Sequence, residues 1–232
     1  MRALVLCYHA VVEGEPQRLA VRRETLESQL RSLLRRGYEP VTATDAVERR
    51  GRLLHVTFDD AYRSAADTLP LLAELGVPAT IFACTGTARD GRPFDVPELR
   101  EDAAADPAAF ATMDFSALRA AASGGVEIGS HTVSHPHLPR LSDADLDREL
   151  RESKVELEDE LSVPCRYLAY PYGEEDDRVR RAARRAGYAA AFAVKPGRVR
   201  SDRFGLPRLA VYRHDTTAGF RLRTSPLLRR LR

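Results

Sequence analysis

The sequence predicts an α/β fold, a distorted (β/α)7-type barrel in a single domain, and three observations lead to this prediction. Short apolar and β-branched runs alternate with longer segments of helical periodicity, which is the pattern of a parallel sheet covered by helices. About seven such units fit the chain of 232 residues, a length at which α/β barrels remain undivided. The hydrophobic fraction of 44% is ordinary for a soluble globular protein.

The predicted strands are short apolar runs that end at turn signals or polar residues. In chain order they span Ala3–Tyr8, Leu53–Phe58, Ala79–Cys84, Val126–Ser130, Cys165–Tyr170, Ala189–Val194 and Arg208–Tyr212. The predicted helices span Arg23–Arg36, Ala65–Leu75, Phe115–Ala122, Asp143–Leu161 and Asp176–Ala186. Ser142 is expected to cap the longest helix. Gly37, Gly76 and Gly187 follow three helices at the position that favours a left-handed residue.

Two segments depart from this repeating pattern. Arg89–Thr112 contains an Asp-Gly turn signal and three prolines between a predicted strand and the next helix. We expect it to be an excursion over the C-terminal face, where barrel enzymes bind substrate, and an inserted surface loop without a role is the alternative. Residues 221–232 carry arginines and leucines without one acid, and form a predicted basic tail. No domain boundary is expected within 1–232.

Charge and cysteine content exclude several classes of partner. The formal net charge is +2, so no nucleic acid partner is expected. The three cysteines are widely spaced in apolar segments, which indicates buried free thiols in a reducing compartment. No apolar run approaches the ~20 residues of a membrane span, and the N-terminal run is interpreted as a strand rather than a signal peptide. A cytoplasmic protein is expected, with weak peripheral membrane contact by the basic tail kept open.

Two short segments carry the chemistry of a metal site. Thr57-Phe58-Asp59-Asp60 ends a predicted strand with adjacent carboxylates, and His131-Thr132-Val133-Ser134-His135 follows another strand. Pro136 limits the histidine segment to at most one helical turn, and one turn brings residues four apart onto one side. Three ligands with an open position are typical of catalytic zinc, and a spare carboxylate is what a hydrolase needs as a base. Zn²⁺ is expected, with Co²⁺, Ni²⁺ or Fe²⁺ as alternatives.

A third segment, Tyr170-Pro171-Tyr172-Gly173, ends a later strand in a turn. In this order and spacing, the three segments resemble the motifs of the polysaccharide deacetylases, carbohydrate esterase family 4. The resemblance covers roughly Leu4 to Phe220. It implies a distorted barrel that removes acetyl groups from N-acetylated sugars with the help of a metal.

The resemblance also implies the roles of individual residues. Asp60, His131 and His135 would hold the metal, and Asp59 would be the general base. The backbone amide of Tyr172 would stabilise the oxyanion together with the metal.

Three departures from the family pattern affect the site. Ala169 stands where an arginine that partners the base is often found, so Arg166 or Arg208 is expected to replace it. Tyr170, Pro171 and Arg208 are predicted to contact the substrate. The chain has no tryptophan, so the aromatic wall of the family is either absent or built from Tyr or Phe.

The third departure concerns the histidine that protonates the leaving amine. The late histidine motif is degraded here, and two candidates remain. His214 lies just past the last predicted strand and has Asp215 beside it, so it is slightly favoured. His9 follows the first strand, which neighbours the last strand in a closed barrel.

The leading functional hypothesis is a metal-dependent hydrolase that removes N-acetyl groups from an N-acetylated sugar or glycan. An O-acetyl esterase, or a deacetylase of a small biosynthetic metabolite, would use the same metal site. A glycan-binding barrel without catalysis is a third alternative, although it predicts damage to Asp59 or the metal ligands and none is found.

Overall fold

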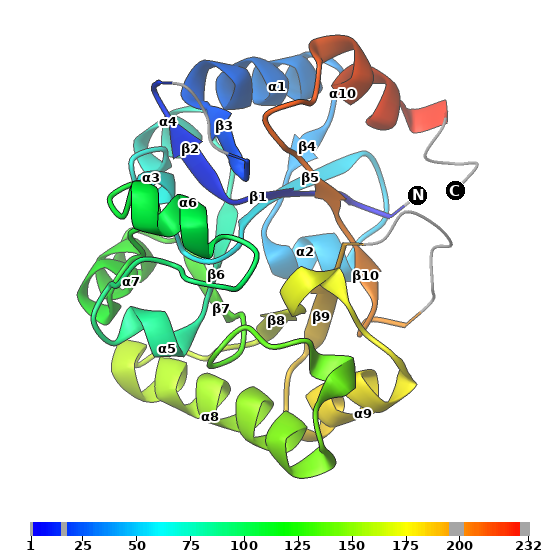
Figure 1. The fold of residues 1–232 in the computed structure, drawn as a ribbon. Coiled ribbons are helices and arrows are strands. Elements are labelled where there is room, and N and C mark those ends of the chain that lie inside the picture. Colours follow the sequence, from blue (N-terminus) through cyan, green and yellow to red (C-terminus); the bar gives the residue numbers. More distant parts are fainter. Residues whose placement is uncertain (1, 15–17, 195–201, 228–232) are drawn as a thin grey trace.

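A parallel sheet wound into a barrel forms the centre of the molecule (Figure 1), as the sequence predicts. The computed structural model describes residues 2–14, 18–194 and 202–227. In these residues the sheet order is β10-β9-β8-β7-β6-β5-β1-β11, with β4 also paired to β5. The strands are β1 (Leu4–Tyr8), β4 (Glu39–Pro40), β5 (Leu53–Phe58), β6 (Ala79–Ala83), β7 (Glu127–Ser130), β8 (Tyr167–Ala169), β9 (Ala190–Ala193), β10 (Leu206–Pro207) and β11 (Leu209–Ala210).

The barrel is closed by one short segment that pairs on both sides. β10 pairs with β9, and β11, two residues further on, pairs with β1. Arg208 lies between them, and its N–H donates to the Ala193 carbonyl at 2.9 Å. The predicted strand Arg208–Tyr212 is therefore displaced toward the N-terminus and split in two. This closure places Arg208 at the seam of the barrel.

Helices cover the outside of the sheet (Figure 1). They are α1 (Arg23–Arg35), α2 (Ala43–Glu48), α3 (Arg63–Ala66), α4 (Leu69–Glu74), α5 (Thr85–Ala88), α6 (Arg100–Ala105), α7 (Phe115–Ser123), α8 (Asp143–Leu161), α9 (Asp177–Arg185) and α10 (Thr217–Arg223), with 3-10 turns η1 (Leu138–Arg140) and η2 (Pro171–Gly173). The bounds predicted for α8 are confirmed, and the Ser142 side chain caps it by accepting from the Asp145 N–H. Gly37, Gly76 and Gly187 have positive φ, as predicted.

One predicted helix, Ala65–Leu75, is wrong as a continuous element. The structure divides this region into α3 and α4, and Pro70 lies in the first turn of α4. Inside a continuous helix, a proline would leave the carbonyl of Ala66 without its N–H partner and clash with that turn. The proline therefore starts a new helix.

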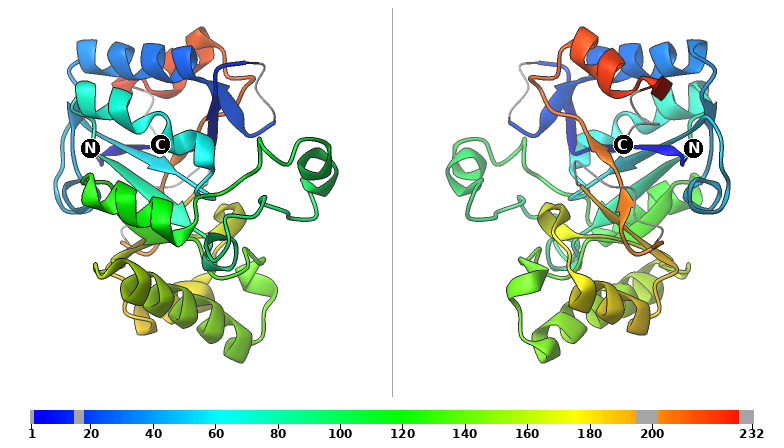
Figure 2. Two further views of the ribbon diagram at one scale, coloured as in Figure 1. Left: turned by 90° about the vertical axis from the view of Figure 1, so that its left-hand side faces the viewer. Right: turned by 90° about the vertical axis from the view of Figure 1, so that its right-hand side faces the viewer.

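Two strands and the excursion rise above the C-terminal end of the barrel (Figure 2). The short strands β2 (Ala10–Val12) and β3 (Ala20–Arg22) pair with each other and belong to no other sheet among the described residues. The predicted excursion Arg89–Thr112 includes α6, and isolated bridges join Pro93 to Ala111 and Tyr62 to Thr112. The excursion is thus anchored at its base, next to the residues that follow β5.

The C-terminal region is only partly a tail. Arg221 and Arg223 belong to α10, and Arg223 forms an ion pair with Asp215. Leu222 and Leu227 are 62% and 70% exposed, and residues 228–232 of the predicted basic tail lie outside the described residues. In the part of the chain that is described, no helix has the length and apolar character needed to cross a membrane. Cys7, Cys84 and Cys165 are free and buried, as predicted.

We predict that Gly129→Ala destabilises the barrel by about 1–3 kcal/mol, because overpacking forces neighbours to shift. A Cβ at Gly129 of β7 would lie 2.5 Å from the Phe82 ring and 3.0 Å from the Tyr167 carbonyl. Urea unfolding measures the loss. Gly14→Ala is the control, since no atom lies within 4 Å of its added Cβ, and equal stability of the two variants would contradict the prediction.

Candidate active site

Asp59 and Asp60 point in different directions although they are adjacent. Both follow β5, and the Asp59 N–H donates to the Tyr8 carbonyl at 2.9 Å, which extends the pairing with β1. The chain then turns sharply, since Asp60 and Ala61 have φ values of 64° and 48°. Left-handed backbone is strained for residues with a Cβ and persists only where the surroundings impose it. The turn lets Asp60 face the histidines while Asp59 faces the barrel seam.

The histidine segment is a tight loop and not the helical turn that was expected. Thr132 and His135 have φ values of 73° and 58°, which no right-handed turn contains. The His135 N–H donates to Thr132 Oγ1 at 3.1 Å, and the Thr132 N–H donates to Ser130 Oγ at 3.1 Å. The His131 and His135 rings come together at 4.8 Å between centroids.

Asp60, His131 and His135 converge on one point, as the sequence predicts for a metal site. Asp60 Oδ1 lies 3.4 Å from His131 Nε2 and 3.6 Å from His135 Nε2, and the three candidate ligand atoms all lie within 4.8 Å of one another. His131 Nδ1 is 2.8 Å from the Ala169 carbonyl. Because a carbonyl only accepts, Nδ1 carries the proton and Nε2 presents a lone pair toward Asp60.

The electrostatics of this cluster suit a cation. Burial raises the pKa of Asp60 well above its usual value, and the charge of Asp59 adds to the effect. Burial lowers the pKa of His131, and burial with the neighbouring His131 lowers the pKa of His135 well below its usual value. Among the described residues Asp60 Oδ1 has no hydrogen-bond donor. Two neutral imidazoles and a carboxylate that lacks a positive partner fit a divalent metal.

Arg208 holds Asp59 in a bidentate pair. Its Nη1 and Nη2 lie 2.6 Å and 2.7 Å from the two carboxylate oxygens. Nη1 also donates to Thr57 Oγ1 at 3.0 Å, and the Cys7 thiol donates to Asp59 Oδ2 at 3.3 Å. Burial opposes ionisation of Asp59, but the charge and hydrogen bonds of Arg208, together with His131 and His9, outweigh it and keep the pKa of Asp59 well below its usual value.

Of the two arginines that the sequence left open, Arg208 is therefore the partner of Asp59. Its side chain has no exposed surface, so the expected contact of Arg208 with substrate is replaced by a contact with the carboxylate. Arg166 is exposed and lies over the Tyr167 ring.

His9 and His214 lie at different distances from this cluster. A ring nitrogen of His9, the Cys7 thiol and an Asp59 oxygen all lie within 4.8 Å of one another. Burial lowers the pKa of His9 to about 4, although Asp59 opposes the shift. His214 is exposed, and Tyr212 lies between the two imidazoles, stacked on His9 at 6.1 Å and on His214 at 5.7 Å. The slight preference for His214 is not supported by this arrangement.

The third segment contributes Tyr172 to the mouth of the barrel, whereas Tyr170 points inward. Tyr170 is buried and its hydroxyl donates to the Phe204 carbonyl at 2.9 Å, and Pro171 is also buried. Tyr172 has φ 57°, and its ring lies 4.6 Å from the His135 ring. The substrate contacts expected for Tyr170 and Pro171 are therefore not accessible through their side chains.

Two residues that were not predicted as site residues, His137 and Glu98, contact Tyr172 at the mouth of the barrel. The His137 ring stacks on Tyr172 at 3.9 Å, and His137 Nδ1 lies 2.9 Å from a Glu174 oxygen. Glu98 of the excursion accepts from the Tyr172 hydroxyl at 3.2 Å. The only sequence signal for His137 was its position after the second motif.

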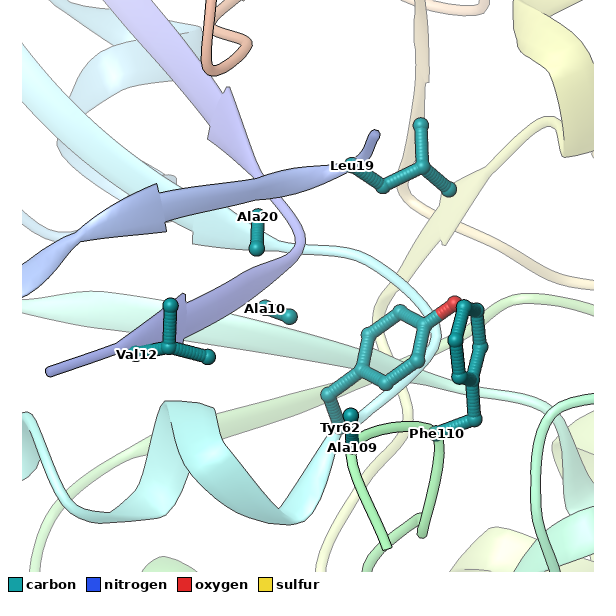
Figure 3. A pocket seen from close by; sticks show the side chains of 7 residues that line it. All are labelled: Ala10, Val12, Leu19, Ala20, Tyr62, Ala109 and Phe110. Carbon is teal, nitrogen blue, oxygen red and sulfur yellow. The ribbon is translucent and has the colours of Figure 1, made fainter. Parts of the chain in front are cut away.

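An apolar pocket lies beside the cluster, between the β2–β3 pair and the excursion. Figure 3 shows Tyr62, Ala109 and Phe110 facing Ala10 and the other residues of the two strands that line the pocket. The Tyr62 hydroxyl is buried and has no hydrogen-bond partner among the described residues. Ala10 follows His9 and Tyr62 is two residues from Asp60, so the pocket adjoins the candidate catalytic groups.

The carboxylate–imidazole cluster lies at the C-terminal mouth of the barrel, the face at which barrel enzymes carry their active sites. Residues 46–191 match the polysaccharide deacetylase family profile, and the chain belongs to this family. It is 24% identical over 217 residues to the Bacillus subtilis (strain 168) protein YxkH, covering 89% of this chain and 70% of that protein.

Solved structures of other proteins share the fold. The Streptococcus pyogenes deacetylase PplD, in complex with acetate, has a TM-score of 0.77 at 20% identity, over 97% of this chain and 99% of that one. IcaB from Ammonifex degensii has a TM-score of 0.75 at 22% identity, over 96% and 95%. At these identities the likeness establishes the barrel and leaves the substrate to be argued from the site.

We predict that Arg208→Met destabilises the protein by about 3–5 kcal/mol, because it leaves Asp59 buried without its partner. A double-mutant cycle with Asp59→Asn should yield a coupling energy of about 1–3 kcal/mol in urea unfolding. Arg166→Met is the matched control and should change stability by less than ~0.5 kcal/mol. Additive effects in the cycle would show that the two side chains do not act as a pair.

Proposed function

We propose that this protein is a metal-dependent deacetylase that removes N-acetyl groups from an N-acetylated sugar or glycan. Asp60, His131 and His135 would hold the metal, with Zn²⁺ the first choice and Co²⁺, Ni²⁺ or Fe²⁺ as alternatives. The single observation that supports this best is the convergence of an Asp60 oxygen without a donor and two Nε2 atoms on one point. Membership of the deacetylase family supports the reaction class.

Asp59 is the proposed general base. When bound, a divalent cation at this site polarises the acetyl carbonyl and lowers the pKa of the attacking water. The Asp59 carboxylate lies 3.9 Å from His131 Nε2, beside the proposed ligands. Because Arg208 keeps Asp59 ionised at neutral pH, the carboxylate is ready to accept the proton of that water.

The backbone N–H of Tyr172 is the proposed donor to the oxyanion. The left-handed conformation of Tyr172 and the packing of its ring on His135 hold this residue beside the proposed ligands. A positioned donor of this kind stabilises a tetrahedral oxyanion by roughly 3–4 kcal/mol in other hydrolases.

His9, rather than His214, is the proposed donor to the leaving nitrogen. A proton passed from Asp59 to His9 needs to cross a gap of less than 4.8 Å, which one bridging water spans. His9 is neutral at pH 7 because burial lowers its pKa, so it has a free lone pair to receive that proton and pass it on. The proton taken from water thus ends on the amine that leaves.

The proposed function is tested by acetate release from a panel of N-acetylated glycans, N-acetylated monosaccharides and O-acetylated glycans. We expect release from N-acetylated glycans that a chelator abolishes and Zn²⁺ or Co²⁺ restores. Release from O-acetylated glycans alone would support the esterase alternative. Binding to glycans without release of acetate at any metal concentration would support a non-catalytic barrel.

We predict that Asp59→Asn retains its metal content and loses activity by ~10² or more, because the base is lost while the ligands remain. Asp60→Asn should instead weaken metal binding, since it removes the only carboxylate of the proposed ligand set. Metal analysis of the purified variants and acetate-release rates decide between the two roles. The reverse pattern would exchange the assignments of Asp59 and Asp60.

We predict that His9→Ala slows hydrolysis of an N-acetylated glycan by ~10² or more, because the leaving amine needs a proton. The same variant should hydrolyse an acetylated nitrophenol almost as well as the wild type, since a nitrophenolate leaves without protonation. His214→Ala is the matched control and should leave both rates within about threefold. An equal loss on both substrates in His9→Ala would point to a structural role for His9.

A further inference from the structure

Glu149, on the longest helix of the described residues, contacts the loop that carries both candidate histidine ligands. One oxygen of its carboxylate accepts from the Val133 N–H at 2.9 Å and from the Ser134 N–H at 3.0 Å. The other oxygen accepts from the Ser134 hydroxyl at 2.6 Å. Glu149 is 8% exposed, so a buried carboxylate binds the middle of the His131–His135 segment.

The opposite edge of the same loop is held by the first turn of α5. The Thr85 N–H donates to the Thr132 carbonyl at 3.1 Å, and the Gly86 N–H donates to the Val133 carbonyl at 2.9 Å. A Cβ at Gly86 would lie only 2.7 Å from the Val133 oxygen. On one side of the loop, N–H groups of α5 therefore bind two carbonyls. On the other side, Glu149 accepts from two consecutive N–H groups.

The contacts from Glu149 and α5 compensate for the unfavourable backbone conformation of the His131–His135 loop. Thr132 and His135 both adopt positive φ, and such residues cost free energy unless their surroundings hold them. Glu149 thus stabilises the non-helical loop, in which both Nε2 atoms face Asp60.

We propose that Glu149 is a positioning residue for the metal ligands. It fixes the spacing of His131 and His135 from a distance, without touching metal or substrate. The proposal rests on the metal site of the proposed function. It predicts that loss of Glu149 weakens metal affinity, whereas a residue that serves only the packing of α8 would leave affinity unchanged in a folded variant.

The experiment measures Co²⁺ affinity and the Co²⁺ absorption spectrum of three variants. Glu149→Met keeps the volume and removes both acceptors, and we expect about 10–100-fold weaker binding with an altered spectrum. Glu149→Gln keeps an oxygen with two lone pairs for the two N–H groups and should bind within roughly threefold of the wild type. Glu152→Gln removes the same charge from an exposed position on α8 and should have no effect.

Two results would overturn the role of Glu149. One is a folded Glu149→Met variant that binds Co²⁺ like the wild type. The other is a Glu149→Gln variant as weak as Glu149→Met, which would assign the effect to charge rather than to geometry. A wild-type protein that binds no Co²⁺ would instead refute the proposed metal site.

If Glu149→Met does not fold, hydrogen exchange in the wild-type protein tests the proposed role of Glu149 instead. In metal-free protein, the Val133 and Ser134 amides should exchange far more slowly than free loop amides, because both are bonded to Glu149. Exchange at the rate of unprotected amides would overturn the proposal.

Discussion

The buried pair between Asp59 and Arg208 links the closure of the barrel to the chemistry at its mouth. Arg208 sits at the seam where β10 pairs with β9 and β11 pairs with β1, and both its terminal nitrogens bind Asp59 across the barrel. A buried charge is tolerated only with a well-placed partner, so the arginine can be buried only if the seam and the end of β5 are both in place. The last strand segment thus completes the fold and the site together.

This pair also separates two neighbouring carboxylates into two chemical roles. Arg208 lowers the pKa of Asp59, whereas burial and the Asp59 charge raise the pKa of Asp60. Adjacent acids whose environments shift them in opposite directions are a frequent feature of hydrolytic sites. One carboxylate has its own cation within the protein, and Asp60 Oδ1 has no hydrogen-bond donor among the described residues. The sharp turn at Asp60 and Ala61 makes this separation possible.

The strands, the longest helix and the convergence of Asp60, His131 and His135 were predictable, because they depend on local patterns and on the shared end of parallel strands. The partner of Asp59 was not predictable. Whether Arg166 or Arg208 reaches Asp59 depends on the path of the closing strand, which pairs with β9 and β1. His9 lies near Asp59 because β1 pairs with β5 in a register that places Tyr8 beside Phe58. The left-handed loop before His135 was also missed, because Glu149 and α5 hold its conformation together with the side chains of Ser130 and Thr132.

The excursion packs against the candidate site. Phe94, near its base, lies 5.0 Å from the His135 ring in an edge-to-face arrangement, and Glu98 accepts from the Tyr172 hydroxyl. Phenylalanine and tyrosine therefore surround His135 in a chain that has no tryptophan. Since α8 and α5 hold the backbone of the histidine loop and the excursion packs on the His135 ring, His135 is supported by α8 and by two consecutive segments of the chain, α5 and the excursion. The geometry of the proposed ligand set thus depends on the whole C-terminal face.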